Sequence, residues 1–101
     1  MFEVRIAPEA GADLRRLYAF RLENDFERDP ESAERMLESI EHGFATLRRT
    51  PHTCRRCIAD PRLRELIIGF GHTGYVALFH IEDDGVVNVL AVRHQREADY
   101  R

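Results

Sequence analysis

The run Val86-Val87-Asn88-Val89-Leu90-Ala91-Val92, which leads into Arg93-His94-Gln95-Arg96-Glu97, decides the fold expected for this chain. Valine dominates its first part, and β-branched side chains favour extended backbone. The polar residues that follow end the strand. Alternation along an extended chain puts apolar side chains on both faces: Val87, Val89 and Ala91 on one, and Val86, Leu90 and Val92 on the other.

Two more strand-like segments precede this one, and short turns join all three. Residues 63–70 and 75–82 are rich in apolar and β-branched side chains. The turns are Gly71-His72-Thr73-Gly74 and Asp83-Asp84-Gly85. Strands joined by such tight turns predict an antiparallel meander for the second half of the chain.

The first half has helical periodicity after one short strand, in which Phe2, Val4 and Ile6 alternate with charged residues. Two apolar stripes with helical spacing follow: Ala10, Leu14, Leu17, Tyr18 and Leu22, then Ala33, Leu37, Ile40, Phe44 and Leu47. A capping carboxylate and a proline, Asp29-Pro30-Glu31, predict where the second helix begins, and Pro51 ends it.

These elements predict an α+β domain over residues 1–101, in the order β-α-α-β-β-β, with a helical hairpin packed on a small antiparallel sheet. A chain of 101 residues has room for one core. Two helices cover only one face of a small sheet. The second apolar face of the last strand is therefore expected to be buried by a partner, a second copy or strong curling of the sheet.

The composition predicts a cytoplasmic protein without membrane contact. The chain is 44% hydrophobic and 33% charged, as in ordinary globular proteins. No apolar run approaches the roughly 20 residues that span a bilayer. The first residues, Met1-Phe2-Glu3-Val4-Arg5, lack the basic start and apolar centre of a signal peptide.

Charge is uneven along the chain, whose formal net charge is −3. All 15 basic residues are arginine, which codon bias in a GC-rich genome explains, although arginine also suits bidentate contacts to carboxylates and phosphates. Residues 48–64 contain six arginines and the single acid Asp60, whereas residues 23–41 contain eight acids and two arginines. A net-acidic chain is a poor general nucleic-acid binder. The arginine-rich segment is either a solvated loop or a contact for an acidic partner or RNA.

Cys54-Arg55-Arg56-Cys57, with His52 before it, resembles part of a zinc or redox motif. Structural zinc needs four ligands, usually as two separated pairs, and the chain has two cysteines. A redox pair needs a helix N-terminus, whereas this pair follows a helix. We therefore interpret the cysteines as reduced loop thiols and expect no metal and no cofactor, with a metal or redox role as the alternative.

His94 differs from the other histidines because it ends a strand beside Arg93 and Arg96, close to Glu97. It is either a general base whose pKa the arginines lower or a polar strand terminus. No glycine-rich phosphate loop, nucleophile elbow or zinc-protease pair is present. Taken alone, the residues therefore favour a binding module with an arginine-rich edge over a catalytic centre.

The order of elements resembles the RelE/ParE toxins of bacterial toxin–antitoxin pairs over nearly the whole chain. Several local motifs carry the resemblance: Ala10-x-x-Asp13-Leu14, Ala33, Leu47, Pro51, Arg64-x-Leu66, Gly74-Tyr75 and the ending Val92 to Glu97. The family includes RelE-like nucleases, which cut mRNA in the ribosome with basic side chains and a C-terminal tyrosine. It also includes ParE-like proteins, which poison DNA gyrase.

The resemblance favours the ParE-like branch. Where the nucleases have two lysines and an arginine, this chain has Ile67, Gly69 and Val76, which cannot stabilise a developing phosphorane. Arg96 alone matches a catalytic arginine, and Tyr100 lies near but not at the position of the tyrosine. The net-acidic balance agrees, since nucleases of this kind are usually strongly basic.

The resemblance implies a cognate antitoxin, DNA gyrase as the target, and a homo-oligomer or a hetero-oligomer with the antitoxin. We expect an amphipathic antitoxin segment to lie across the domain and to neutralise arginines with its acids. The residues expected to bind the target are Arg64, Arg93, His94, Arg96 and Tyr100. The alternative is a ribosome-dependent mRNA endoribonuclease whose catalytic residues are Arg62, Arg64, His94 and Arg96.

Overall fold

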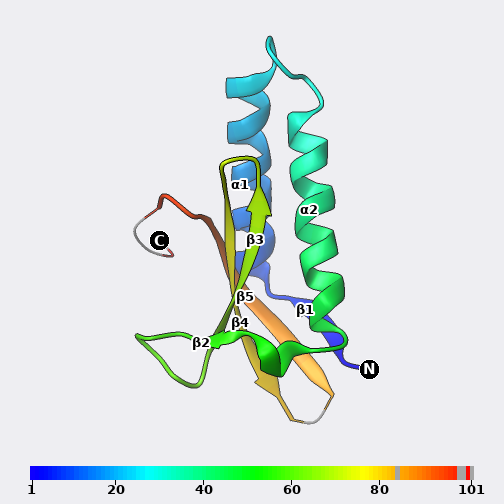
Figure 1. The fold of residues 1–101 in the computed structure, drawn as a ribbon, viewed down its shortest axis with the longest axis vertical. Helices are drawn as coiled ribbons and strands as arrows, with labels where there is room; N and C mark the ends of the chain where they lie inside the picture. The colour runs from blue at the N-terminus through cyan, green and yellow to red at the C-terminus, as the bar shows by residue number, and fades with distance from the viewer. Residues whose placement is uncertain (84, 98–99, 101) are drawn as a thin grey trace.

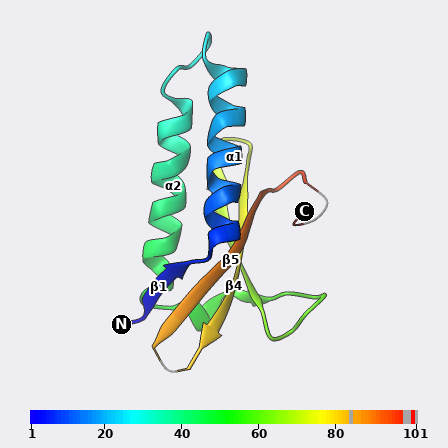
Figure 2. The same ribbon diagram turned by 180° about the vertical axis from the view of Figure 1, so that it is seen from behind.

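In the computed structural model, a helical hairpin packs on one face of a five-stranded sheet (Figures 1 and 2). The structure describes residues 1–83, 85–97 and 100. Its elements are β1 (Glu3–Ile6), α1 (Pro8–Asp25), α2 (Ser32–Leu47), β2 (Arg55–Arg56), β3 (Arg64–Phe70), β4 (Thr73–Glu82) and β5 (Val86–His94). The predicted order is confirmed, and a 3-10 turn, Pro51–Thr53, follows α2.

The strand order is β1-β5-β4-β3-β2. The predicted antiparallel meander forms β3, β4 and β5, but β1 pairs in parallel with β5, so that the sheet is mixed. The two-residue strand β2, which pairs with β3, was not predicted. It lies in the arginine-rich segment, where no apolar alternation indicates a strand. Asp84 of the predicted turn before β5 lies outside the described residues.

The second helix begins at Ser32, so the predicted start at Asp29-Pro30-Glu31 was wrong. Glu31 occupies the N-cap position without a capping side-chain hydrogen bond. The carboxylate of Asp29 forms an ion pair with Arg35 instead. Residues 26–31 therefore form the turn of the hairpin.

The core lies between the helices and the sheet, with α1 over β5 and α2 over β3. Its buried members include Leu17, Met36, Ile40, Leu47, Ile68, Tyr75, Phe79, Val87, Val89 and Val92. Helix α2 approaches β3 closely at Gly43, where an added Cβ would lie 2.9 Å from Ile68. Neither helix in the described part of the chain is long and apolar enough to cross a membrane.

A β-bulge in β5 changes which side chains reach the core. Val89 lies opposite Phe79 and Ala91 lies opposite Leu78, so Leu90 is the extra residue of β5. Because an extra residue reverses the alternation, Val92 joins Val87 and Val89 in the core. The predicted assignment to the two sheet faces was therefore right for Val87 and Val89 and wrong for Val92. A bulge within a run of apolar residues produces no clear pattern in the sequence.

The bulged part of β5 is bonded to helix α1 by a buried carboxylate. The N–H of Ala7, just after β1, donates to Val89 O, and there the pairing of β1 with β5 ends. The N–H of Val92 instead donates to Oδ2 of Asp13 at 2.9 Å. Asp13 is 2% exposed, and Arg16 lies 3.9 Å from its other oxygen. The aspartate therefore satisfies a strand N–H that has no strand partner.

Gly74, at the start of β4, has no space for a side chain. An added Cβ would lie 2.1 Å from the carbonyl oxygen of Ile68, whereas one added at its cross-strand neighbour Gly69 meets nothing within 4 Å. We expect Gly74→Ala to lower the free energy of unfolding by about 2 kcal/mol through overpacking. Gly69→Ala is the matched control and should stay within about 0.5 kcal/mol of wild type in urea denaturation. Equal stability of the two variants would contradict this explanation of Gly74.

Candidate functional site

His94 lies at the end of β5, next to the start of β4. Its Nε2 is 3.1 Å from the Thr73 hydroxyl, and its Nδ1 accepts the backbone N–H of Arg96 at 3.1 Å. Because Nδ1 is an acceptor, the proton of the neutral ring lies on Nε2 and is donated to Thr73. The ring also meets Tyr75 edge-on, with 5.3 Å between centroids. Both nitrogens of His94 are therefore engaged.

The surroundings of His94 favour its neutral form. Burial lowers the pKa of His94, Arg21 and Arg96 lower it further by charge, and Glu97 opposes them. Glu97 also accepts the backbone N–H of His94 at 2.8 Å and pairs with Arg16 at 3.3 Å. The group is therefore an uncharged imidazole at neutral pH.

The lowered pKa of His94 predicts a pH dependence of stability. The unfolded chain takes up a proton near pH 6.5 and the folded chain only at lower pH, so stability falls as the pH drops below about 6.5. His94→Gln, which keeps hydrogen-bonding groups and does not titrate, should flatten this part of the curve. Urea denaturation between pH 5 and 8 measures it. An unchanged slope in the variant would assign the dependence to other groups.

Arg21 of α1 is the residue of this region that the sequence analysis missed. Its Nε donates to the Tyr75 hydroxyl at 3.0 Å, and its Nη1 to Asp25 at 3.0 Å and to Ser32 at 3.4 Å. The guanidinium also lies 4.8 Å from the centre of the Phe70 ring. Arg21 therefore joins both helices to the β3–β4 hairpin. No motif indicates this role, because Tyr75 is distant in sequence.

Arg93 holds the backbone of residues 94–97, and Tyr100 is bonded to β3. Nη1 of Arg93 donates to the carbonyl oxygens of His94, Gln95 and Glu97, the last at 2.9 Å. Its guanidinium lies 4.9 Å from the centre of the Tyr100 ring. The Tyr100 hydroxyl donates to Glu65 at 2.8 Å, and burial and this carboxylate raise the pKa of Tyr100 above its usual range. Both side chains are thus engaged within the fold.

Arg62 and Arg64 lie far from His94. Arg64 is opposite Phe79 on β4, whereas His94 is opposite Tyr75, a separation along β4 of about 13 Å. Arg64 donates to the carbonyl oxygens of His52 and Cys54, and Arg62 pairs with Asp60 at 2.9 Å. The structure therefore does not bring together the four residues considered for a nuclease.

Arg96 is a predicted site residue on the surface of the molecule. It is exposed, and its guanidinium has no hydrogen bond or ion pair within residues 1–83, 85–97 and 100. Arg16 of α1 approaches the same end of the sheet through its pair with Glu97. An exposed arginine with an ordered backbone, next to a neutral histidine, is suited to bind a partner.

Ile67, Gly69 and Val76, which stand where the RelE-like nucleases are expected to have basic residues, lie on β3 and β4. Ile67 is opposite Val76, and Gly69 is opposite Gly74. Ile67 is 44% exposed, whereas Val76 is buried. Neither Ile67 nor Val76 has a charge that could contact a phosphate, and Gly69 has no side chain.

The cysteines lie on either side of β2. Cys54 packs partly against the core, and burial raises the pKa of its thiol. Both thiols are free. Within the described residues, no three histidine, cysteine or acidic side chains come together as a metal site would require.

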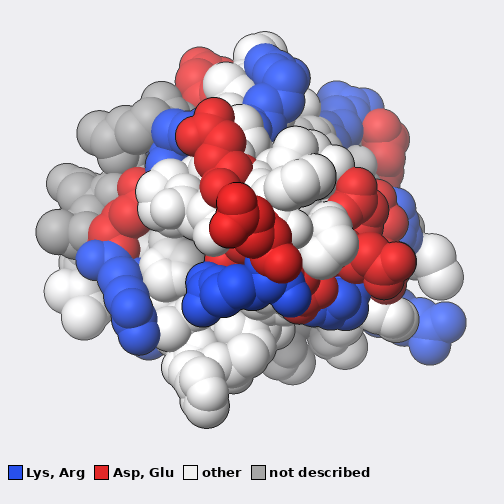
Figure 3. Space-filling model, turned by 90° about the horizontal axis from the view of Figure 1, so that it is seen from above, with Lys and Arg blue, Asp and Glu red and all other residues white. Residues whose placement is uncertain are grey.

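Figure 3 views the molecule from above, and arginine and acidic side chains lie side by side on this face. Pairs at the hairpin end account for part of the mixture: Arg28 with Asp25, and Arg35 with Asp29. This face therefore has no continuous basic surface.

Comparison with known proteins agrees with the fold and the motifs. The family model of the ParE toxin of the type II toxin–antitoxin system parDE matches residues 4–99. Among solved structures, the chromosomal ParDE toxin–antitoxin system from P. aeruginosa is similar, with a TM-score of 0.75 and 19% identity, over 93% of this chain and 96% of that one. A comparison with curated proteins returned no match. The chain belongs to the ParE toxin family of type II toxin–antitoxin systems.

Proposed function

We propose that this toxin stops growth by binding DNA gyrase and trapping its cleaved DNA, and that a cognate antitoxin neutralises it. The observation that carries the proposal is the apolar pair Ile67 and Val76, with Gly69, at positions where nucleases of the resembling superfamily need cations. Electrostatic stabilisation of a phosphorane requires charges near the phosphate. A protein-binding toxin has no such requirement.

The arrangement of the basic residues supports the same proposal. Arg62 and Arg64 form contacts at one end of the sheet, and His94 is held neutral at the other. Arg96 remains as the exposed cation beside His94. We propose Arg96 and its surroundings as part of the surface that contacts gyrase, and the cytoplasm as the place of action.

The decisive experiment mixes purified toxin with gyrase, ATP and supercoiled plasmid. Linear plasmid that accumulates after detergent and protease treatment would support the proposal, because it reports trapped cleavage complexes. The same preparation is then added to translating ribosomes with a defined mRNA. Cutting of the mRNA at the ribosome, with gyrase unaffected, would refute the proposal and favour the nuclease alternative.

Arg96→Ala tests the contact surface. An exposed arginine at the centre of an interface often contributes enough binding energy that its loss weakens binding about tenfold or more. We expect the toxin concentration needed for half-maximal cleavage complex to rise by about this factor, with an unchanged urea midpoint. Arg49→Ala, in the turn that follows α2 and also exposed, is the matched control. Equal loss in both variants would remove Arg96 from the contact.

A further inference from the structure

The turn that ends β5 presents Arg96, and each N–H group of residues 94–97 has an acceptor. The N–H of His94 donates to the Glu97 carboxylate at 2.8 Å, and that of Gln95 to the carbonyl oxygen of Gly74 at 2.9 Å. The N–H of Arg96 donates to Nδ1 of His94 at 3.1 Å, and that of Glu97 to the carbonyl oxygen of His94 at 3.0 Å. The backbone that carries the Arg96 side chain is therefore held at each of these groups.

The acceptor of the Arg96 N–H differs in kind from the other three. Those are a carboxylate and two carbonyl oxygens, whereas this one is an imidazole nitrogen, and imidazole is the side chain whose charge changes between pH 5 and 8. Nδ1 of His94 accepts because the proton of the neutral ring lies on Nε2, beside the Thr73 hydroxyl. In the charged ring both nitrogens are donors. Protonation of His94 therefore turns the acceptor of the Arg96 N–H into a second donor, and the bond is lost.

The environment of His94 sets the pH at which this bond is lost. The titratable and charged side chains that face the ring, or pair with those that do, come from α1, β4 and the turn itself: Arg16, Arg21, Asp25, Tyr75, Arg96 and Glu97. Burial and the charges of Arg21 and Arg96 lower the pKa of the ring, and Glu97 opposes them. The bond to the Arg96 N–H is therefore intact at neutral pH and is broken only in acid, below the usual pKa of histidine.

We propose that His94 is a positioning residue of the target contact: its neutral ring fixes the backbone of Arg96, and protonation releases that backbone and weakens binding of the target. The inference rests on the role of Arg96 in the proposed function. A side chain on a fixed backbone loses less conformational entropy when it binds, so the ordered turn increases affinity. The toxin should therefore bind its target at neutral pH and bind it less well in acid.

NMR of the isotope-labelled toxin alone tests the release of the turn. Between pH 8 and 4.5, the heteronuclear NOE of the Arg96 amide should fall with the same midpoint as the titration of the His94 ring protons, because the freed backbone gains fast motion. The amide of Gln95, whose acceptor is a carbonyl oxygen, should keep its value. His94→Asn should show no transition at Arg96. An NOE at Arg96 that stays constant while the ring titrates would overturn the proposal.

Asparagine and glutamine at position 94 separate the two ring nitrogens. The amide oxygen of asparagine reaches the place of Nδ1 and can accept the Arg96 N–H, whereas the amide of glutamine reaches the place of Nε2 and cannot. At pH 8, His94→Asn should bind immobilised gyrase within about twofold of wild type and His94→Gln about fivefold more weakly, the effect of one hydrogen bond. Urea midpoints confirm that both variants are folded. Equal affinities of the two variants would refute the assignment to Nδ1.

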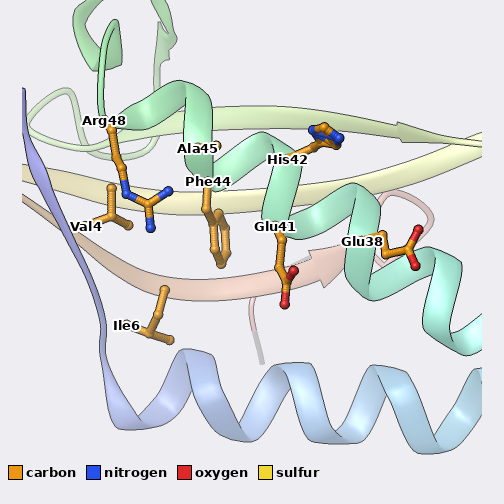
Figure 4. Close-up of a pocket in the computed structure, with 8 residues that line it drawn as sticks. All are labelled: Val4, Ile6, Glu38, Glu41, His42, Phe44, Ala45 and Arg48. Atoms are coloured by element: carbon orange, nitrogen blue, oxygen red, sulfur yellow. The ribbon is translucent and has the colours of Figure 1, made fainter.

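His42→Asn is the matched control. This exposed histidine of α2 lines a groove between α2 and β1, with Val4, Ile6 and Phe44 among its neighbours, and it has no part in the turn that presents Arg96 (Figure 4). Its replacement should leave both the affinity for gyrase and the NOE of the Arg96 amide unchanged. A loss equal to that of His94→Gln would show that histidine replacements weaken binding without regard to position, and the proposal would fail.

A double variant shows whether His94 acts through Arg96. Arg96→Ala with His94→Gln should bind gyrase no more weakly than Arg96→Ala alone, because a positioning residue has no effect once the positioned side chain is absent. The affinity of wild type relative to His94→Asn should fall up to about fivefold as the pH drops through the pKa of His94, and this ratio cancels pH effects on gyrase itself. Additive losses in the double variant, or tighter binding of wild type in acid, would show that the ring acts on its own and would overturn the proposal.

Failure of this proposal and failure of the proposed function can be told apart. The NMR experiment contains no gyrase, so release of Arg96 on protonation of His94 supports the positioning role even if gyrase is not the target. Toxin that binds gyrase at no pH would refute the proposed function. Conversely, trapped gyrase together with an Arg96 amide that does not respond to the ring refutes the positioning role alone.

Discussion

Replacing Asp13 with alanine is expected to lower the free energy of unfolding by about 3 to 5 kcal/mol, the largest effect that we predict. The change leaves the N–H of Val92 buried without an acceptor, since β1 does not extend to this part of β5. It also removes the carboxylate next to Arg16. Urea denaturation measures the loss, and hydrogen exchange should show faster exchange at Val92.

Asp13→Asn separates the hydrogen bond from the charge. The amide oxygen can still accept the N–H of Val92, although a neutral acceptor is weaker than a carboxylate. We expect a loss of about 1 to 2 kcal/mol for Asn. Glu23→Ala removes an exposed carboxylate of the same helix and should change stability by less than about 0.5 kcal/mol. Similar losses for Ala and Asn at position 13 would show that the hydrogen bond is not the reason that Asp13 matters.

Arg21→Met is expected to lower the free energy of unfolding by about 3 kcal/mol. The variant loses three hydrogen bonds and the contact with Phe70, and it leaves the Tyr75 hydroxyl without its donor. Arg15→Met, at an exposed position of the same helix, should be close to wild type. Arg21→Lys should recover less than half of the stability that Arg21→Met loses, because one ammonium group cannot replace the planar guanidinium.

Arg21 also has a second measurable effect. Its charge contributes to the lowered pKa of His94, so Arg21→Met should raise the pKa of that histidine. NMR titration of the His94 ring protons measures the change, and Arg15→Met should leave the value unchanged. A stable Arg21→Met variant with an unaltered His94 pKa would contradict the role that we assign to Arg21.

Periodicity predicted the elements because it reports burial directly. The apolar stripes of both helices and the three strands of the meander lie where the sequence indicated. The start of α2 was misplaced because Asp29 has two possible partners, the helix end and Arg35, and only the folded geometry decides between them. Strand β2 was not predicted because its two arginines are held by backbone pairing with β3 and not by burial, and periodicity detects burial alone.

The candidate site was harder to predict because its contacts join distant parts of the chain. Arg93 and Arg96 were both predicted to bind the target, yet Arg93 holds backbone carbonyls whereas Arg96 is exposed. Asp13 was recognised only as part of a family motif, and its bond to Val92 depends on a bulge in β5. Arg64 was assigned to the same site as His94, but the register of β3 against β4 separates them.

The parallel pairing of β1 with β5 has a consequence for synthesis. Glu3 lies opposite Val86, so the first strand made has no neighbour until the last strand leaves the ribosome. At about 5 to 20 residues per second, β1 waits roughly 4 to 17 seconds for its partner. Contacts of such long sequence separation form late and slowly. A chain that stops short of β5 therefore has neither a partner for β1 nor the Val92 N–H for Asp13, and folding is completed only after β5 has been made.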